Sequence, residues 1–162
     1  MNGDALEHAV GKLLAATGLS LALAESCTGG LICSRLTDVP GISSYLMGGI
    51  VAYSYEAKER LLEVSHETLI SFGAVSKETA IEMARGARRY FDAELGVGVT
   101  GIAGPGGGMP DKPVGLTYIA LAADDWERCE RYVWESDRVG NKSHSADAAL
   151  RLIREYLAGI KE

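Results

Sequence analysis

The sequence predicts an α/β sandwich, and two observations support this fold class. Short apolar segments bounded by Gly, Pro or Ser, such as residues 19–25 and 95–101, are typical of buried strands. They alternate with segments whose apolar residues recur at helical spacing, which is the pattern of α/β domains. Two further strands are expected at 114–124 and 126–136, on either side of a turn, and are predicted to form an antiparallel hairpin.

The predicted helices follow from apolar spacing and from their end residues. The first helix is expected over residues 3–18, with Asp4 as its N-cap and Gly18 at its end. Ser65 and Ser76 are suited to N-cap two later helices. The remaining expectations are helices at 29–37, 56–64, 65–73, 76–93 and 143–160 and a strand at 48–54.

Length and composition predict one domain covering residues 1–162, with a small-molecule partner. The formal charge of -6 and the lack of a long Lys/Arg run argue against nucleic-acid binding. No segment reaches the roughly 18 apolar residues of a membrane span, and the first residues do not resemble a signal peptide. A cytoplasmic protein without a membrane partner is therefore expected, and apolar positions 45–47 are candidates for a homodimer or other homo-oligomer interface.

The three cysteines predict reduced thiols and no metal site. Cys27, Cys33 and Cys129 cannot all pair, and none shares a ligand spacing with another Cys or with a His. The chain has 20 glycines, and those at 29–30, 48–49, 96–101 and 104–108 are candidates for backbone that approaches a ligand closely.

Three unusual segments each follow a predicted strand: "ESCTGG", "YSYEAK" and "TGIAGPGGG". Ligands in open α/β sheets bind beyond the carboxyl ends of the strands. The sequence therefore predicts a binding or catalytic site where these three segments meet.

Ser26, in the first of these segments, has two interpretations. Ser26 or Thr28 could simply cap the following helix. Alternatively, Ser26 could be a nucleophile whose oxyanion is held by backbone N–H groups of the turn and of the coming helix. Cys27 competes with Ser26 for this role, since helix N-termini favour thiolates.

A serine nucleophile needs a base, and no histidine is suitably placed. His8, His66 and His144 fall in helical and exposed surroundings. Lys58 could serve if its surroundings lower its pKa, and Tyr53 could also point into the site. A solvated surface lysine is the alternative interpretation of Lys58.

The third segment, the glycine-rich loop "TGIAGPGGG", also has two interpretations. It could hold a phosphate with successive N–H groups, with Thr100 adding a hydroxyl, or it could be a surface turn. It matches neither common nucleotide motif. Lys112 or Arg138 could supply charge to a phosphate, or either could lie on the surface.

Taken together, "ESCTGGLI", "DVPGISSYLMGGIVAYSYEAKERLL", "GAVSKETAIEMARGAR", "VTGIAGPGGGMPDKPVG" and "SDRVGNK" resemble the CinA C-terminal domain family over nearly the whole chain. Some members are nicotinamide mononucleotide deamidases. The resemblance implies a three-layer α/β/α sandwich with a mixed, mostly parallel sheet. It also implies hydrolysis of the carboxamide of nicotinamide mononucleotide to nicotinate mononucleotide and ammonia, without a cofactor or metal.

The resemblance assigns roles to individual residues. Ser26 is the expected nucleophile, Lys58 the base and Tyr53 a residue that assists or orients them. The expected substrate-binding residues are Thr28, Gly29, Gly30, Gly41, Gly48, Thr100, Gly101 and Arg138. Ser136 stands where the family has glycine, and Lys142 where it often has arginine. The alternative function is a non-catalytic nucleotide-binding module associated with competence or DNA damage.

Overall fold

The computed structural model describes residues 4–160; both ends of the predicted domain and the first residue of the predicted first helix lie outside this range. Alternating strands and helices make up the described chain. In order, they are α1 (Leu6–Thr17), β1 (Leu21–Glu25), α2 (Leu31–Thr37), the short 3₁₀ helix η1 (Ile42–Ser44), β2 (Leu46–Val51), α3 (Tyr55–Leu62), α4 (His66–Phe72), α5 (Lys77–Phe91), β3 (Leu95–Gly101), β4 (Leu116–Ala122), β5 (Glu127–Val133) and α6 (Arg138–Ile160).

The strands form one mixed sheet in the order β2-β1-β3-β4-β5. β1 is parallel to both β2 and β3, whereas β3–β4 and β4–β5 are antiparallel pairs. All the strands except β4 therefore run in the same direction. The predicted hairpin of the last two strands is confirmed, as is the mixed, mostly parallel sheet.

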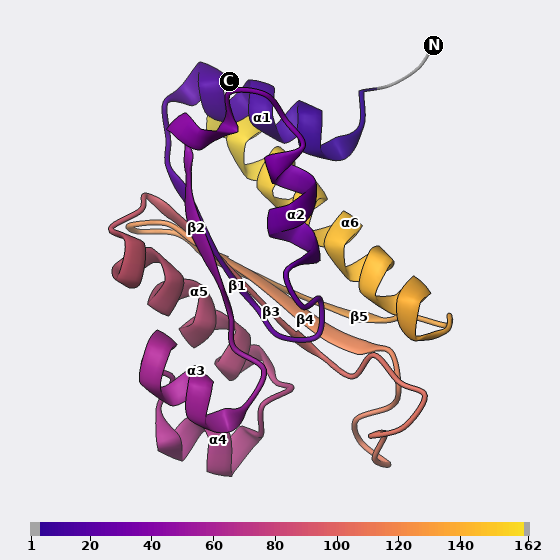
Figure 1. Cartoon of the computed structure of the whole chain (residues 1–162). Helices are drawn as coiled ribbons and strands as arrows, with labels where there is room; N and C mark the ends of the chain where they lie inside the picture. The colour runs from indigo at the N-terminus through magenta and orange to yellow at the C-terminus, as the bar shows by residue number, and fades with distance from the viewer. Residues whose placement is uncertain (1–3, 161–162) are drawn as a thin grey trace.

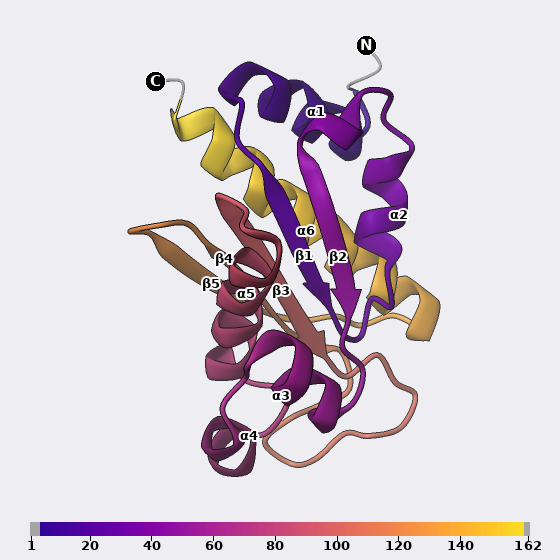
Figure 2. The same ribbon diagram turned by 60° about the vertical axis from the view of Figure 1, so that its left-hand side comes forward.

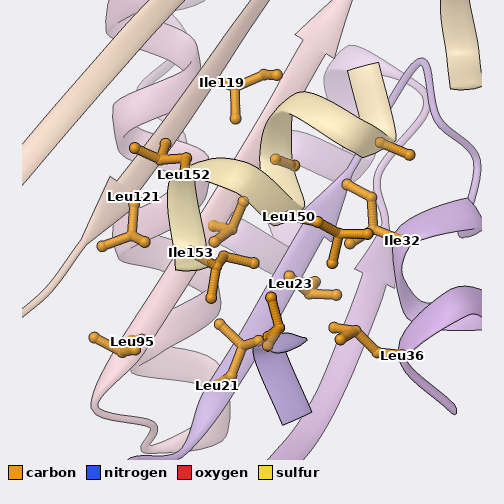
Figure 3. Packing of buried hydrophobic residues seen from close by; sticks show 14 of the residues in the cluster. Leu21, Leu23, Ile32, Leu36, Leu95, Ile119, Leu121, Leu150, Leu152 and Ile153 are labelled. Atoms are coloured by element: carbon orange, nitrogen blue, oxygen red, sulfur yellow. The ribbon is translucent and has the colours of Figure 1, made fainter. Parts of the chain in front are cut away.

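Helices cover both faces of this sheet, which gives the three layers of an α/β/α sandwich. α1, α2 and α6 lie on one face, and α3, α4 and α5 lie on the other (Figure 1 and Figure 2). Successive β1 side chains point to opposite faces, as the period of a strand requires. Leu21 and Leu23 join the core beneath α2 and α6 (Figure 3), while Ala22 and Ala24 pack in the second core with α3 and α5.

Helix ends agree with the sequence at some positions and correct it at others. Gly18 ends α1 in the left-handed conformation, with φ of 73°, and the Ser76 side chain accepts a hydrogen bond from Thr79 N as an N-cap should. The predicted cap Asp4 is wrong, because the N-cap of α1 is Ala5. Ser65 is the N-cap residue of α4, as predicted, but its side chain makes no cap hydrogen bond.

The last helix begins earlier than predicted, at Arg138 rather than at residue 143. Its first turn thus contains the segment that the sequence analysis left outside any helix. The extension is supported locally by Asp137, whose backbone carbonyl accepts from Asn141 N and whose carboxylate accepts from Gly140 N. The consequence is that Arg138 is presented by a helix that also packs on the sheet.

Two glycines of β3 serve packing rather than ligand binding, which corrects that part of the glycine prediction. A β-carbon on Gly96 would overlap the Ala84 carbonyl, and one on Gly98 would stand 2.7 Å from Ala84 N. The absence of these side chains lets α5 lie directly on β3. No helix within residues 4–160 is long and apolar enough to cross a membrane.

Candidate active site

The predicted meeting of three strand ends is present. Glu25, the last residue of β1, pairs with Val51 of β2 and Val99 of β3, so the segments that follow these parallel strands emerge at the same edge of the sheet. A pocket of about 160 Å³ opens there. It is lined by Ser26, Cys27, Tyr53, Tyr55, Lys58, Ala74, Val75, Thr100, Gly101, Ala103 and Arg138.

Ser26 and Lys58 form a hydrogen-bonded pair in this pocket. Lys58 Nζ donates to Ser26 Oγ over 2.9 Å and to the Ala52 carbonyl over 2.9 Å. Ser54 caps α3 by accepting from Ala57 N, which places Lys58 in the first turn of the helix, directed back at β1. Lys58 is 1% exposed, so the interpretation of a solvated surface lysine is wrong.

Burial shifts the pKa of the candidate base, Lys58, and the pKa of the competing nucleophile, Cys27, in opposite directions. It lowers the pKa of Lys58 to about 8, because an ammonium in this apolar surrounding loses hydration, and this favours the neutral amine that a base must be. It raises the pKa of the Cys27 thiol to about 12, with a smaller contribution from the nearby Glu25 carboxylate. Cys27 is therefore a thiol at neutral pH, and only Ser26 has a base within hydrogen-bond distance.

Tyr53 lies in the pocket wall, but its hydroxyl has a different partner from the one expected. Arg138 donates to Tyr53 Oη over 3.0 Å and to the Gly104 carbonyl over 2.7 Å. The Tyr53 hydroxyl makes no hydrogen bond to Ser26 or Lys58. The Tyr53–Arg138 pair instead links the end of β2 to α6 and to the glycine-rich loop at the pocket mouth.

Thr100 lines the pocket and holds a neighbouring part of the pocket wall in place. Its hydroxyl donates to the Ala74 carbonyl over 2.7 Å, while Ala74 N donates to Tyr55 Oη over 3.3 Å. Ala74, Val75 and Tyr55 are pocket residues that the sequence analysis missed. Tyr55 could have been found, since it shares the segment "YSYEAK" with Tyr53 and Lys58, whereas residues 74–75 join two helices and carry no chemical signal.

The turn after Ser26 corrects the capping interpretation. The N-cap of α2 is Gly30, with no side-chain cap bond, so neither Ser26 nor Thr28 caps the helix. The backbone N–H groups of Cys27 and Thr28 make no hydrogen bond to another residue of the described chain. Thr28, Gly29 and Gly30 follow the pocket-lining residues but do not themselves line the pocket.

Three other predicted residues lie away from the pocket. Gly48 is in the middle of β2, where a β-carbon would overlap the Phe91 ring, and Gly41 precedes β2 at the opposite edge of the sheet. Their absence of a side chain serves packing and a turn, not substrate contact. Lys112 donates to the Phe72 carbonyl over 2.5 Å and so attaches the glycine-rich loop to α4. Gly101 does line the pocket, as expected.

A larger hollow of about 390 Å³ lies at the other end of the sheet but lacks comparable chemistry. Its three arginines are already engaged: Arg85 with the Glu127 carboxylate, Arg88 with the Ala123 carbonyl and Arg89 with the Leu62 carbonyl. The smaller pocket is the better candidate because it is lined by a serine that accepts a hydrogen bond from a buried amine.

Residues 4–160 contain no group of three or more His, Cys, Asp or Glu side chains that could hold a metal ion. The three histidines are exposed, as predicted. The polar side-chain groups that line the pocket are two hydroxyls, two phenols, a thiol, an amine and a guanidinium.

Comparison with known proteins identifies the family. The model of the CinA C-terminal domain matches residues 3–157. A relative from Desulforamulus reducens, named as a competence-damage inducible protein, is 47% identical over 156 residues, and a CinA-like protein from Syntrophotalea carbinolica is 47% identical over 157 residues. These matches cover 96% and 97% of this chain but 38% of each relative. The chain belongs to the CinA C-terminal domain family.

Solved structures agree with this assignment. A crystal structure of a CinA superfamily protein from Klebsiella pneumoniae superposes with a TM-score of 0.91 at 30% identity and covers 95% of this chain and 96% of its own. The competence/damage inducible protein CihA from Agrobacterium tumefaciens gives 0.86 at 38% identity, with 98% of both chains covered.

Proposed function

We propose that the protein hydrolyses the carboxamide of nicotinamide mononucleotide to nicotinate mononucleotide and ammonia. The observation that carries this proposal is the contact between Ser26 Oγ and a buried lysine amine whose pKa is lowered to about 8. Serine attacks an amide when a neighbouring base accepts its proton, and a desolvated lysine can be that base.

The reaction begins with neutral Lys58, which accepts the Ser26 hydroxyl proton along the line of the observed hydrogen bond. Ser26 Oγ forms a bond to the carboxamide carbon, and the carbonyl oxygen becomes an oxyanion. The N–H groups of Cys27 and Thr28 are the candidate donors to that oxygen, and donors of this kind are worth about 3 to 4 kcal/mol each in well-studied hydrolases.

The carbon–nitrogen bond then breaks as Lys58 returns its proton to the leaving nitrogen, which departs as ammonia. The remaining acyl group is an ester of Ser26. Water, deprotonated by the neutral Lys58 amine, attacks this ester, and Lys58 returns the proton to Ser26 Oγ. The products are the carboxylate and the free serine, with no net change in the enzyme.

Substrate size and charge are matched to the surroundings of the pocket. At about 160 Å³ it is smaller than the roughly 300 Å³ at which sites for drug-sized ligands begin. It suits the flat pyridine carboxamide, and the ribose phosphate would extend past Arg138 into a neighbouring hollow of about 300 Å³ that shares Ala103 and Arg138. We assign the phosphate to the Arg138 guanidinium, whose charge suits it.

Ammonia release from nicotinamide mononucleotide by the purified protein tests the proposal. Ser26→Ala and Lys58→Ala should each lower kcat by about 10³-fold or more while leaving the fold intact, because each removes a group used in every chemical step. Cys27→Ser is the matched control: it alters the next residue of the turn, and most of the activity should remain.

Parallel assays with nicotinamide, its riboside and its dinucleotide define the substrate. Tight binding of the mononucleotide without ammonia release would contradict hydrolysis and would favour a nucleotide-binding module. Full activity of Ser26→Ala or of Lys58→Ala would contradict the mechanism.

A further inference from the structure

A buried carboxylate next to the nucleophile has no part in the chemistry described so far. Glu25 precedes Ser26 and is 1% exposed. Its Oε1 accepts from Ile32 N over 3.0 Å and its Oε2 accepts from Cys33 N over 3.0 Å. The side chain therefore reaches from the end of β1 to the start of α2 and satisfies two N–H groups that a helix leaves without partners.

This contact closes the turn that carries Ser26. Two residues of the turn adopt the left-handed region, Gly29 with φ of 62° and Gly30 with φ of 99°. Because glycine permits many other conformations as well, these two residues do not by themselves hold the turn in one shape. Its internal hydrogen bonds are Gly29 N to the Ser26 carbonyl and Leu31 N to the Thr28 carbonyl. The Glu25 carboxylate fixes the far end of the turn relative to its beginning.

The contact also leaves the serine hydroxyl available. The side-chain oxygen of a serine at a strand-to-helix turn commonly accepts a hydrogen bond from a backbone N–H of the helix and so caps it. Here the carboxylate of Glu25 binds the helix N–H groups, and Ser26 Oγ meets Lys58 instead. Since Ile32 N and Cys33 N are occupied, the N–H groups left for an oxyanion belong to the turn itself.

The backbone of Glu25 is connected to the other partner as well. Its carbonyl accepts from Ala52 N over 2.9 Å, and the Ala52 carbonyl accepts from Lys58 Nζ. Glu25 thus bonds through its side chain to α2 and through its carbonyl to Ala52, the residue whose own carbonyl accepts from Lys58 Nζ.

We propose that Glu25 is a positioning residue: its carboxylate holds the turn so that Ser26 Oγ and the Cys27 and Thr28 N–H groups keep their reactive arrangement around Lys58. This inference rests on the proposed function for its kinetic consequence. Displacing a reacting group by about 1 Å can cost roughly 10²-fold in rate.

The test uses Glu25→Ala and Glu25→Gln. The glutamine side chain keeps the size of glutamate and one acceptor, but it directs an amide N–H₂ at the second backbone N–H. Because it keeps the size, it remains available as a test if Glu25→Ala does not fold. We expect kcat for ammonia release to fall about 10²-fold in Glu25→Ala and by an intermediate factor in Glu25→Gln, with KM within about threefold of the wild type.

A second measurement does not depend on the identity of the substrate. A fluorophosphonate forms a P–O bond with an activated serine hydroxyl and releases fluoride, so its labelling rate per folded molecule reports the reactivity of Ser26. The Glu25 variants should label more slowly by a factor similar to the fall in kcat. The pKa in the pH dependence of labelling should stay near that of the wild type, because Glu25 acts through geometry.

Glu94→Gln is the matched control. Glu94 also accepts a backbone hydrogen bond, from Ser20 N over 2.6 Å, but at the opposite end of β1, and its replacement should leave labelling unchanged. If the Glu25 variants lose thermal stability but keep wild-type kcat and labelling per folded molecule, the proposal is overturned. Wild-type labelling without ammonia release would overturn the proposed substrate alone, and absence of both would overturn the serine nucleophile and this inference together.

Discussion

Lys58 is a buried lysine in a position where a structural role alone would favour an apolar residue. Lys58 and Leu62, one turn apart, are the buried residues of α3, and the Lys58 ammonium has one carbonyl and one hydroxyl as partners. Burying an amine with so few acceptors favours its neutral form. The burial that lowers the pKa of Lys58 should therefore weaken the fold.

The first prediction concerns the pH dependence of activity. With a pKa of about 8, roughly one Lys58 in ten is neutral at pH 7 and about half are neutral at pH 8. We expect kcat/KM for ammonia release to rise with pH below about 8 and to level off above it. A profile that is flat from pH 6 to 9 would contradict Lys58 as the base.

The second prediction concerns stability. The folded state binds the Lys58 proton less tightly than the unfolded chain does, so stability is lost as the pH falls from 10.5 to about 8, and the cost then stays constant at lower pH. The shift from 10.5 to about 8 corresponds to about 3 kcal/mol. Lys58→Met should raise the free energy of unfolding at pH 7, measured by urea denaturation, while abolishing activity. A gain that persists undiminished at pH 10.5 would show that the charge is not its cause.

At the scale of elements, β3 and α5 approach each other closely because β3 has glycine where its side chains would face the helix. A β-carbon on Gly98 would overlap the Ala80 carbonyl and stand 2.7 Å from Ala84 N. These are backbone atoms in the middle of a helix, so they cannot move aside alone. α5 can therefore lie this close to β3 only because Gly98 has no side chain.

The third prediction follows from this contact. Gly98→Ala should lower the free energy of unfolding by about 3 kcal/mol, since overpacking against a rigid neighbour is destabilising, as measured by urea denaturation. Gly106→Ala is the control, because nothing lies within 4 Å of the added carbon, and its stability should remain close to that of the wild type. Equal stability of the two variants would contradict the packing role of Gly98.

The elements of the fold were predictable from the sequence to a greater extent than their ends. The buried strands β1, β3 and β4 were located by their apolar residues, because a buried strand must be apolar whatever its neighbours are. The more exposed β5 was located by its position after the turn that follows β4. The start of α6 was missed because Arg138 and its polar neighbours lack the apolar spacing of a helix face. The role of Gly96 and Gly98 was misassigned because glycine occurs both where a ligand and where a helix approaches the backbone closely. The sequence alone does not distinguish these two cases.

The candidate site was predictable where chemistry resides in side chains at strand ends, as for Ser26 and Lys58. The partner of Tyr53 could not be predicted, because its contact with Arg138 joins residues far apart in the chain. Glu25 also escaped notice, since an acidic residue at a strand end does not reveal that its carboxylate binds the following helix. Such contacts depend on tertiary geometry, which local pattern does not contain.

At the scale of the whole molecule, the pocket combines residues from both layers of helices and from three strand ends, so a bound nucleotide should stabilise the entire fold. Tyr55 and Lys58 come from α3 on one face of the sheet, and Arg138 from α6 on the other. A ligand that contacts both layers binds the folded state and not the unfolded chain.

The fourth prediction uses Ser26→Ala, which should bind nicotinamide mononucleotide without consuming it. At a ligand concentration 100 times Kd the gain is about 2.7 kcal/mol, or roughly 5–11 °C in melting temperature for a chain of this size. The riboside, which lacks the phosphate, should give a smaller shift, and adding Arg138→Gln should remove most of the difference. Equal shifts for the two ligands would contradict a phosphate contact at Arg138.

The early start of α6 has a consequence for synthesis on the ribosome. Ser26 and Lys58 are translated in the first half of the described chain, yet the wall that Arg138 and Ala103 complete depends on a helix that begins at residue 138. Asn141, in the same first turn, donates to the Ala103 carbonyl over 3.0 Å and so attaches the loop to α6. A nascent chain therefore cannot contain the complete pocket until this helix has been translated and has docked.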